Sequence, residues 1–251
     1  MNIWVPLLIN MLAGFLCWLL SLRLKDVSIV DSLWSLMFWL AALFWLWPLG
    51  GVSARDLVLL ILVSIWAWRL SIYLTVRNWG KAEDHRYQVI RNNNSPGFEW
   101  KSLFIVFCLQ ALLAWIASLV ILGASGEKPL GWLDYLGIAL WLLGFLFETV
   151  GDAQLAAFKK QAGSGAVLNK GLWRYSRHPN YFGECCLWWG LYLLAISAGN
   201  YWVVVSPILM TLLLLKVSGV SLLESTITER RPEYAEYIRR TNAFIPWLPK
   251  P

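Results

Sequence analysis

The sequence predicts an all-α integral membrane protein with about seven transmembrane helices. Of its 251 residues, 59% are hydrophobic and only 14% are charged, whereas a soluble domain is about half apolar and about a quarter charged. Several apolar runs reach the length, roughly 20 residues, that a helix needs to cross a bilayer. We therefore expect one polytopic membrane domain over residues 1–251.

The expected spans, in chain order, cover residues 3–22, 33–49, 57–75, 101–122, 132–150, 182–198 and 201–220. The first span lacks a basic segment before it and a convincing small-residue cleavage site after it, so we expect it to be retained rather than removed as a signal peptide. Residues 88–96 hold three Asn and one Pro and predict a loop. The tail, residues 221–251, predicts a short amphipathic helix on the bilayer surface and then an end broken by Pro.

The distribution of basic residues predicts the orientation in the membrane. The linkers after spans one, three and five, together with the tail, hold most of the 21 Lys and Arg residues, whereas the other linkers hold only Arg55 and Lys128. Because basic loops stay in the cytoplasm, the N-terminus should lie outside and the C-terminus in the cytoplasm. A nucleic-acid-binding protein would need a solvated basic face with base-stacking aromatic residues, and the sequence offers none.

The cysteines predict no metal site. Cys17, Cys108, Cys185 and Cys186 have no spacing typical of metal ligands, and three of them lie in or beside apolar segments. Small apolar fillers of the core are the favoured interpretation. Nothing in the sequence indicates a required protein partner.

A polar stripe marks the end of the fifth span. Glu148, Asp152, Leu155 and Lys159 are spaced i, i+4, i+7 and i+11, so they share one face of a helix. The stripe is either a solvated edge of a helix that leaves the membrane or a face that meets a polar ligand. We favour the ligand for Glu148 and Asp152, because an unpaired carboxylate near the end of an apolar run is costly.

The third span ends in a second polar face. Arg69, Tyr73 and Arg77 are spaced i, i+4, i+8. A Tyr at this depth is often an interfacial anchor, but two arginines on its face indicate a buried polar cavity at least as strongly. Arg77 could pair with an anion, and a nearby cation would ease proton donation by the Tyr73 hydroxyl. The residues that follow, 83–86, are either a solvated loop or a lid.

Asp31 stands at the entry to the second span and has two interpretations. It is either a helix N-cap beside Ser32 or a residue that faces the site, and the N-cap is slightly favoured from sequence alone.

The segment Gly171–Glu184, GLWRYSRHPNYFGE, carries the strongest signal. It crowds charged and polar side chains between long apolar runs, and a bilayer tolerates such groups only where they face protein, water or a polar ligand. This motif, the preceding GDAQ and FK, and the closing YAEYIRRTNAFIPWLP resemble the steroid 5α-reductase superfamily, most closely its bacterial branch. Sterol C14 reductases share RHPNYFGE, and isoprenylcysteine and phospholipid methyltransferases are more loosely similar. The resemblance runs from SIVDSLW, at the second span, to the tail.

The resemblance implies seven helices and NADPH held in a cavity that faces the cytoplasm of a bacterial inner membrane. The implied reaction reduces a carbon–carbon double bond conjugated to a ketone in an apolar, steroid-like substrate. In the steroid reductases a Tyr and a nearby Glu, with a Gln beside it, polarise the ketone. We find no such Gln–Glu pair here, and the nearest candidates are Tyr73 for the Tyr and Asp31 for the acid.

The candidate cofactor-binding residues come mostly from this resemblance. It places the motif residues Arg174, His178, Asn180, Tyr181 and Glu184 at or near the nucleotide and aligns Asp152 and Lys159 with positions that contact it. Basic residues at the same membrane face, Arg77, Lys170 and Arg177, complete the set. The catalytic candidates are Tyr73 first, and then Tyr87, Asp31 and Glu148.

The sequence is also compatible with two other functions. An S-adenosylmethionine-dependent methyltransferase acting on a lipid or a prenylated thiol would use the same polar segment for another nucleotide. A transporter would place its polar residues near the middle of the bilayer and usually carry an internal repeat. The polar residues here gather at one membrane face, which argues against transport.

Overall fold

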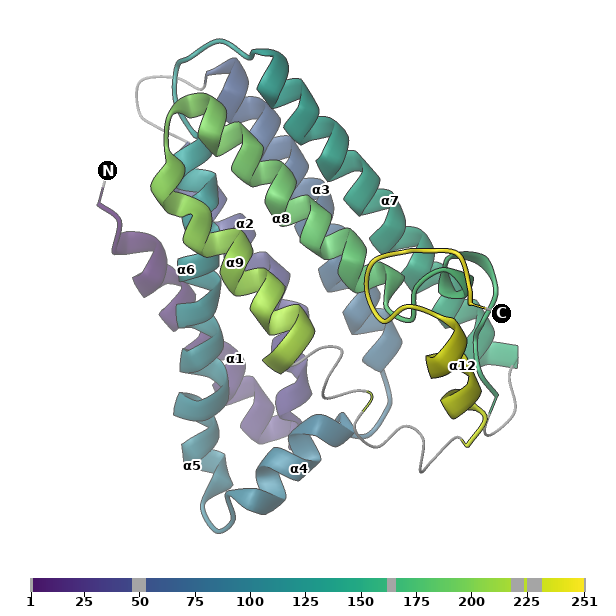
Figure 1. The fold of residues 1–251 in the computed structure, drawn as a ribbon. Coiled ribbons are helices and arrows are strands. Elements are labelled where there is room, and N and C mark those ends of the chain that lie inside the picture. The colour runs from purple at the N-terminus through teal and green to yellow at the C-terminus, as the bar shows by residue number, and fades with distance from the viewer. Residues whose placement is uncertain (1, 47–52, 162–165, 218–223, 225–231, 251) are drawn as a thin grey trace. The chain divides into compact units, whose positions relative to one another are not determined.

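The computed structural model describes residues 2–46, 53–161, 166–217, 224 and 232–250. Over these residues its regular elements are all helical. Contacts divide the chain into two compact units, unit 1 (Met1–Pro129) and unit 2 (Leu130–Pro251). Each unit is described by itself; unit 1 runs from purple to teal in Figure 1, and unit 2 continues from there to yellow.

Unit 1 is a group of long helices joined by a short polar helix. Helix α2 packs on α1, α3 and α6. The elements are α1 (Val5–Leu24), η1 (Val27–Ile29), α2 (Val30–Leu46), α3 (Ala54–Asn78), α4 (His85–Asn93), α5 (Phe98–Ser102), the π-helical segment η2 (Leu103–Cys108) and α6 (Leu109–Ala124).

Unit 2 is built on a pair of long helices that pack against each other, α7 and α8, with α9 beside α8 (Figure 1). The elements are α7 (Trp132–Gln161), η3 (Gly171–Arg174), α8 (Pro179–Ala198), η4 (Tyr201–Val204), α9 (Val205–Leu212), the π-helical segment η5 (Leu213–Val217) and α12 (Tyr234–Arg240).

Six helical segments are long and apolar enough to cross a membrane: Val5–Leu24, Val27–Leu46, Ala54–Asn78, Phe98–Ala124, Trp132–Gln161 and Pro179–Ala198. The chain is therefore a multi-pass membrane protein. The expected seventh span corresponds to Tyr201–Lys216, which is apolar but shorter, and residues 218–220 lie outside the described part of the chain. Residues 221–223, 225–231 and 251 of the expected tail lie outside it as well, and α12 is a helix in the described part of the tail.

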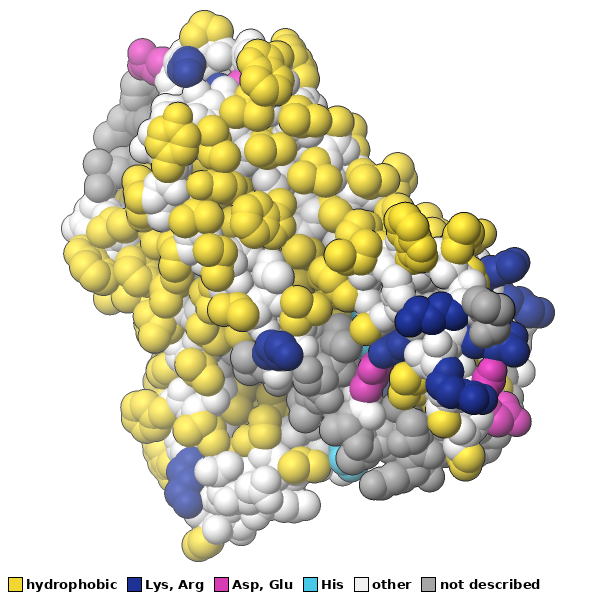
Figure 2. Space-filling model, viewed as in Figure 1, with side chains coloured by type: hydrophobic (Ala, Val, Ile, Leu, Met, Phe, Trp, Pro, Cys, Tyr) yellow, Lys and Arg dark blue, Asp and Glu magenta, His cyan; other side chains and the backbone are white. Residues whose placement is uncertain are grey.

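The surface agrees with this assignment. Large hydrophobic side chains are widely exposed along the spans, for example Leu8 at 66% and Leu146 at 58%. Figure 2 shows hydrophobic side chains over α8 and α9, and basic side chains gathered around α12. Such an apolar belt would be costly in water and is suited to contact with lipid.

The helices extend beyond the expected spans because polar side chains cap them. The Ser53 side chain accepts a hydrogen bond from the Asp56 amide, so α3 begins before residue 57. Asp26 accepts from the Ser28 amide and starts the short η1 turn that leads into α2. Caps of this kind satisfy amides that a helix start leaves without partners.

The loop predicted for residues 88–96 is wrong over most of its length, since α4 covers His85–Asn93. Asp84 caps this helix by accepting from the Arg86 amide, and the Glu83 carboxylate pairs with Arg91 at 2.8 Å. The third anchor is Tyr87, whose ring is buried. Tertiary packing therefore overrides the weak helix propensity of an Asn-rich segment.

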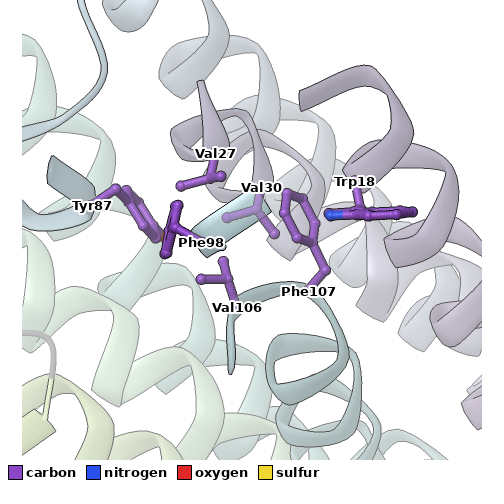
Figure 3. Packing of buried hydrophobic residues seen from close by; sticks show 7 residues of the cluster. All are labelled: Trp18, Val27, Val30, Tyr87, Phe98, Val106 and Phe107. Atoms are coloured by element: carbon purple, nitrogen blue, oxygen red, sulfur yellow. The ribbon is translucent and has the colours of Figure 1, made fainter. Parts of the chain in front are cut away.

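The ring of Tyr87 packs into an apolar cluster of unit 1 (Figure 3). Helix α1, the start of α2 and the segment before α6 all contribute side chains to it, namely Trp18, Val27, Val30, Phe98, Val106 and Phe107. This packing holds α4 against the ends of the long helices and so fixes the position of the Tyr87 hydroxyl.

Candidate functional site

Three elements of unit 1 bring a Tyr, an acid and a Gln together. The Tyr87 hydroxyl of α4 donates a hydrogen bond to Asp31 Oδ1 of α2 at 2.6 Å. Gln110 of α6 donates from its amide nitrogen to the same hydroxyl oxygen at 3.0 Å. The hydroxyl is therefore held by hydrogen bonds from two sides.

A guanidinium completes this polar cluster. Arg86 donates to Asp31 Oδ2 at 2.7 Å and to Asp84 Oδ1 at 3.0 Å. Asp31 lies in the first turn of α2, but its carboxylate is bonded to Arg86 and Tyr87. The N-cap interpretation of Asp31 is therefore wrong: Asp31 lies inside α2, and the capping side chain is Asp26, which precedes the η1 turn.

The environment raises the pKa of Tyr87 well above its usual value of 10. Burial is the largest cause, and the nearby Asp31 carboxylate adds to it, since both disfavour a phenolate. Tyr87 therefore keeps its proton at neutral pH and remains a hydrogen-bond donor.

Two of the three residues on the expected polar face of α3 contact each other. The Arg77 guanidinium lies over the Tyr73 ring, 5.9 Å from its centroid, so these two residues share a face as their spacing predicts. Arg77 Nε also donates to Asn78 Oδ1 at 3.0 Å. Tyr73 is partly buried.

In unit 2, two residues of the motif meet Glu224. Arg177 donates two hydrogen bonds to the Glu224 carboxylate, from Nε at 2.7 Å and from Nη2 at 2.8 Å. His178 Nε2 lies 3.0 Å from Glu224 Oε1. The third guanidinium nitrogen of Arg177, Nη1, donates to the Ile238 carbonyl at 3.1 Å and to the Thr241 carbonyl. Arg177, expected at the cofactor, is thus bonded to the C-terminal part of unit 2.

The backbone of the motif also bonds to the segment that follows α12. The Arg177 amide donates to the Asn242 carbonyl at 2.9 Å, and the Trp247 amide donates to the Tyr175 carbonyl at 2.9 Å. The Ser176 hydroxyl donates to the Phe244 carbonyl at 2.8 Å. The motif and residues 242–247 therefore form one hydrogen-bonded structure.

Asn180 and Asp152 meet where α8 begins beside α7. The Asn180 amide nitrogen donates to Asp152 Oδ1 at 3.1 Å, which fixes the orientation of the amide because a carboxylate only accepts. The Asn180 carbonyl oxygen is then buried with no hydrogen-bond partner among the described residues. Such an atom is costly and needs a donor, and a ligand bearing N–H or O–H groups would supply one.

The other predicted residues of unit 2 differ in how far they are exposed to solvent. Glu148 and Glu184 are buried, at 2% and 9% exposure, whereas Lys159, Lys170 and Arg174 are exposed. Tyr181 is partly buried, and its ring stacks on His178 with centroids 5.5 Å apart. A pocket of about 520 Å³ opens beside the motif, with Arg174 and Arg240 among its lining residues.

The Glu224 cluster gives a testable pH dependence. Burial acts to raise the pKa of Glu224, but hydrogen bonds from His178 and Arg177 and the charge of Arg177 outweigh it and lower the pKa from its usual 4.5 to about 2. A lowered pKa contributes stability that is present above pH 4.5 and is lost as the pH falls toward 2. The contribution is at most on the order of 3 kcal/mol.

We therefore expect unfolding of unit 2 in detergent to become easier as the pH is lowered from 5 to 2. The Glu224→Gln variant should show a smaller acid dependence over the same interval. Thermal melts followed by circular dichroism at each pH measure this difference. Equal acid dependence of the two proteins would mean that other carboxyl groups dominate.

Two residues of these clusters, Gln110 and Glu224, were not among the predicted site residues, although Glu224 stood out in the sequence as the one tail charge not expected to be solvated. Gln110 could have been noticed because it places an amide side chain in the middle of the apolar run 101–122. Glu224 was noticeable because its carboxylate follows closely on the seventh apolar run. In both cases the partner lies far away in the chain, 23 residues for Gln110 with Tyr87 and 47 residues for Glu224 with Arg177.

Comparison with known proteins gives a family. An uncharacterized protein of Schizosaccharomyces pombe (strain 972 / ATCC 24843) is 26% identical over 276 residues, which cover 97% of this chain and 79% of the relative. No solved structure matches the chain. The family model described as "Protein of unknown function (DUF1295)" matches residues 17–241, and the chain therefore belongs to the DUF1295 family.

Proposed function

We propose that the protein is an NADPH-dependent oxidoreductase that reduces a carbon–carbon double bond conjugated to a ketone. The substrate class is an apolar, steroid-like lipid of the 3-oxo-Δ4-steroid type. The proposal includes a bacterial inner membrane, seven spans, an N-terminus outside and an active site that faces the cytoplasm. The orientation is supported by the basic linkers, and access through the bilayer suits a lipid-soluble substrate.

The observation that carries the proposal is the bonded group Tyr87, Asp31 and Gln110. A Tyr, an acid and a Gln are the side-chain types that polarise the ketone in the steroid reductases, which this sequence resembles. The sequence offers no adjacent Gln–acid pair, and here the acid and the Gln come from different helices. We therefore place Tyr87 ahead of Tyr73 as the residue that binds the ketone oxygen.

The chemistry of these residues suits the reaction. NADPH, when bound, supplies the hydride that adds to the β-carbon of the enone. Negative charge then develops on the ketone oxygen, where the Tyr87 hydroxyl, by turning its one proton from Asp31 to that oxygen, can donate a hydrogen bond and stabilise the enolate until a proton from water adds at the α-carbon. Burial raises the pKa of Tyr87, so its hydroxyl stays protonated and acts as a hydrogen-bond donor. Gln110, which donates to the Tyr87 oxygen, strengthens Tyr87 as a donor.

Unit 2 offers groups that fit a dinucleotide phosphate. The Asn180 carbonyl oxygen has no partner among the described residues and suits the amide or hydroxyl donors of a nucleotide. Lys159, Lys170 and Arg174 are exposed on the same unit and could neutralise phosphates. These residues would bind and orient the cofactor, and the exposed cations would raise its local concentration.

One experiment separates this function from its rivals. The purified protein is examined by mass spectrometry for a co-purified nucleotide, and NADPH oxidation is followed at 340 nm with a 3-oxo-Δ4-steroid in detergent micelles. NADP(H) together with steroid-dependent oxidation is the expected result. A bound sulfonium cofactor would instead identify a methyltransferase. If the protein carried neither cofactor, the result would be evidence against both enzyme classes.

We expect NADPH to bind more tightly than NADH. Lys159, Lys160, Lys170 and Arg174 are all exposed on unit 2, and a 2′-phosphate adds charge for them to contact. A hydrogen bond to a charged group is worth about 1.5–3 kcal/mol, which predicts a preference of about 10-fold or more. Titrations of both nucleotides at moderate salt test this, and equal dissociation constants would remove the assignment of a 2′-phosphate.

A further inference from the structure

Glu224 is the point at which the motif and the C-terminal part of unit 2 are joined. Its carboxylate is bonded to both Arg177 and His178. The Arg177 and Glu224 side chains are only 9% and 17% exposed, so the ion pair is largely shielded from water. The remaining guanidinium nitrogen of Arg177, Nη1, donates hydrogen bonds to the carbonyls of Ile238 and Thr241. The Glu224 carboxylate therefore holds the Arg177 guanidinium in place, and that guanidinium links the motif to residues 238–241.

The residues next to this joint are the ones that face the proposed nucleotide. His178 directly precedes α8, its ring stacks on Tyr181, and Asn180 is the second residue of α8. A shift of His178 would therefore move both Tyr181 and the Asn180 amide. Asn180 tolerates little movement, since its amide is also bonded to Asp152 at 3.1 Å.

The tail is bonded to the same loop along its length. The Tyr237 hydroxyl donates to the Trp173 carbonyl, and the Thr241 hydroxyl donates to the Arg174 carbonyl at 3.4 Å. With the backbone bonds of Arg177 and Trp247, these contacts span the motif from residue 173 to residue 177. Loss of the Glu224 charge would leave Arg177 shielded from water without its counter-ion, and that loosens the joint from its centre.

We propose that Glu224 is a positioning residue for nucleotide binding, acting through Arg177 and His178 to hold Asn180 and Tyr181 in place. This inference rests on the proposed function, because it concerns the nucleotide assigned to the motif. It also gives the C-terminal segment, residues 234–247, a role in the site. Arg177 binds protein in this arrangement and orients the nucleotide-facing residues.

The chain provides a matched control in Glu236. Glu236 also pairs with arginines, Arg239 and Arg240, but the side chains of these two are 77% and 59% exposed. Both Glu236 and Arg240 lie in α12. Exposed pairs of this kind contribute little. Glu224→Gln and Glu236→Gln each remove one negative charge with almost no change in side-chain volume. The two variants therefore differ only in how buried the carboxylate is and in which residues it pairs with.

The experiment compares the wild type, Glu224→Gln, Glu236→Gln and Arg177→Lys as full-length proteins in detergent. Hydrogen exchange followed by mass spectrometry reports on the amides of residues 173–178 and 242–247, and titration gives the dissociation constant for NADPH. Circular dichroism and gel filtration check that each variant is folded. Arg177→Lys keeps the charge but cannot make the paired bonds to Glu224.

We expect Glu224→Gln to speed exchange in both segments and to weaken NADPH binding by about 10-fold to 100-fold, the range for losing a hydrogen bond to a charged group. Arg177→Lys should follow it, and Glu236→Gln should stay within about 2-fold of the wild type. Faster exchange with unchanged affinity would overturn the positioning role, and so would unchanged exchange.

The failure of this inference is distinct from that of the proposed function. A wild-type protein that binds no NADPH would contradict the function, and with it nucleotide positioning, whatever the exchange data give. The exchange measurements would still decide whether Glu224 joins the motif to residues 242–247. Weak binding confined to the Glu224 and Arg177 variants would leave both proposals standing.

Discussion

Replacing Tyr87 by Phe should lower the turnover of steroid-dependent NADPH oxidation by about 10²-fold or more, the contribution typical of a positioned proton donor. The substitution removes one hydroxyl and leaves the buried ring in its apolar cluster. The ion pair of Asp31 with Arg86 stays available. Affinity for NADPH should be unchanged, because the nucleotide is assigned to the motif of unit 2.

Tyr73→Phe is the matched control for this prediction. It also removes a phenolic hydroxyl, and it keeps the ring over which the Arg77 guanidinium lies. Turnover and the dissociation constant for NADPH are measured for both variants with the same 3-oxo-Δ4-steroid. If Tyr73→Phe loses turnover and Tyr87→Phe keeps it, the ketone is polarised from α3, as the spacing of Arg69, Tyr73 and Arg77 first indicated.

Long apolar runs made the transmembrane helices predictable, whereas the polar helix α4 was not. A transmembrane span is recognised from about 20 consecutive apolar residues, and each of the six membrane-spanning helices before residue 199 overlaps a predicted span. Helix α4 holds two Asn and four further polar or charged residues among its nine, so its own sequence carries little helical signal. It forms because Asp84 caps it and Tyr87 is buried, and the burial depends on the rest of unit 1.

The candidate site was predictable as a segment but not as a set of contacts. The polar residues of Gly171–Glu184 stand out because apolar runs surround them. Nothing local indicates that Tyr87 meets Asp31, 56 residues earlier, or that Arg177 meets Glu224. A motif also cannot tell whether an Arg serves a ligand or the protein, which is why Arg177 was expected at the cofactor.

Gly183→Ala should destabilise the protein by about 3 kcal/mol, the upper part of the usual cost of overpacking. A Cβ atom at Gly183 would lie 2.4 Å from the Gly144 carbonyl oxygen and 2.5 Å from the Glu148 amide nitrogen. Both are backbone atoms of α7, so no side-chain rotation can make room. The two helices would have to separate where Asn180 meets Asp152, and NADPH affinity should fall as well.

The sign of this change is the decisive point, because intrinsic helix propensity favours Ala over Gly by about 1 kcal/mol. Without a close approach of α7 and α8, Gly183→Ala would therefore stabilise the protein. Gly131→Ala is the control, since a Cβ there meets only Asp134 Oδ2, at 3.9 Å. Unfolding in mixed micelles, followed by circular dichroism, should give a loss of stability for position 183 alone. Gly131 precedes α7 and carries no helix-propensity gain, so a gain of stability at position 183 would by itself show that α7 and α8 are not packed backbone to backbone there.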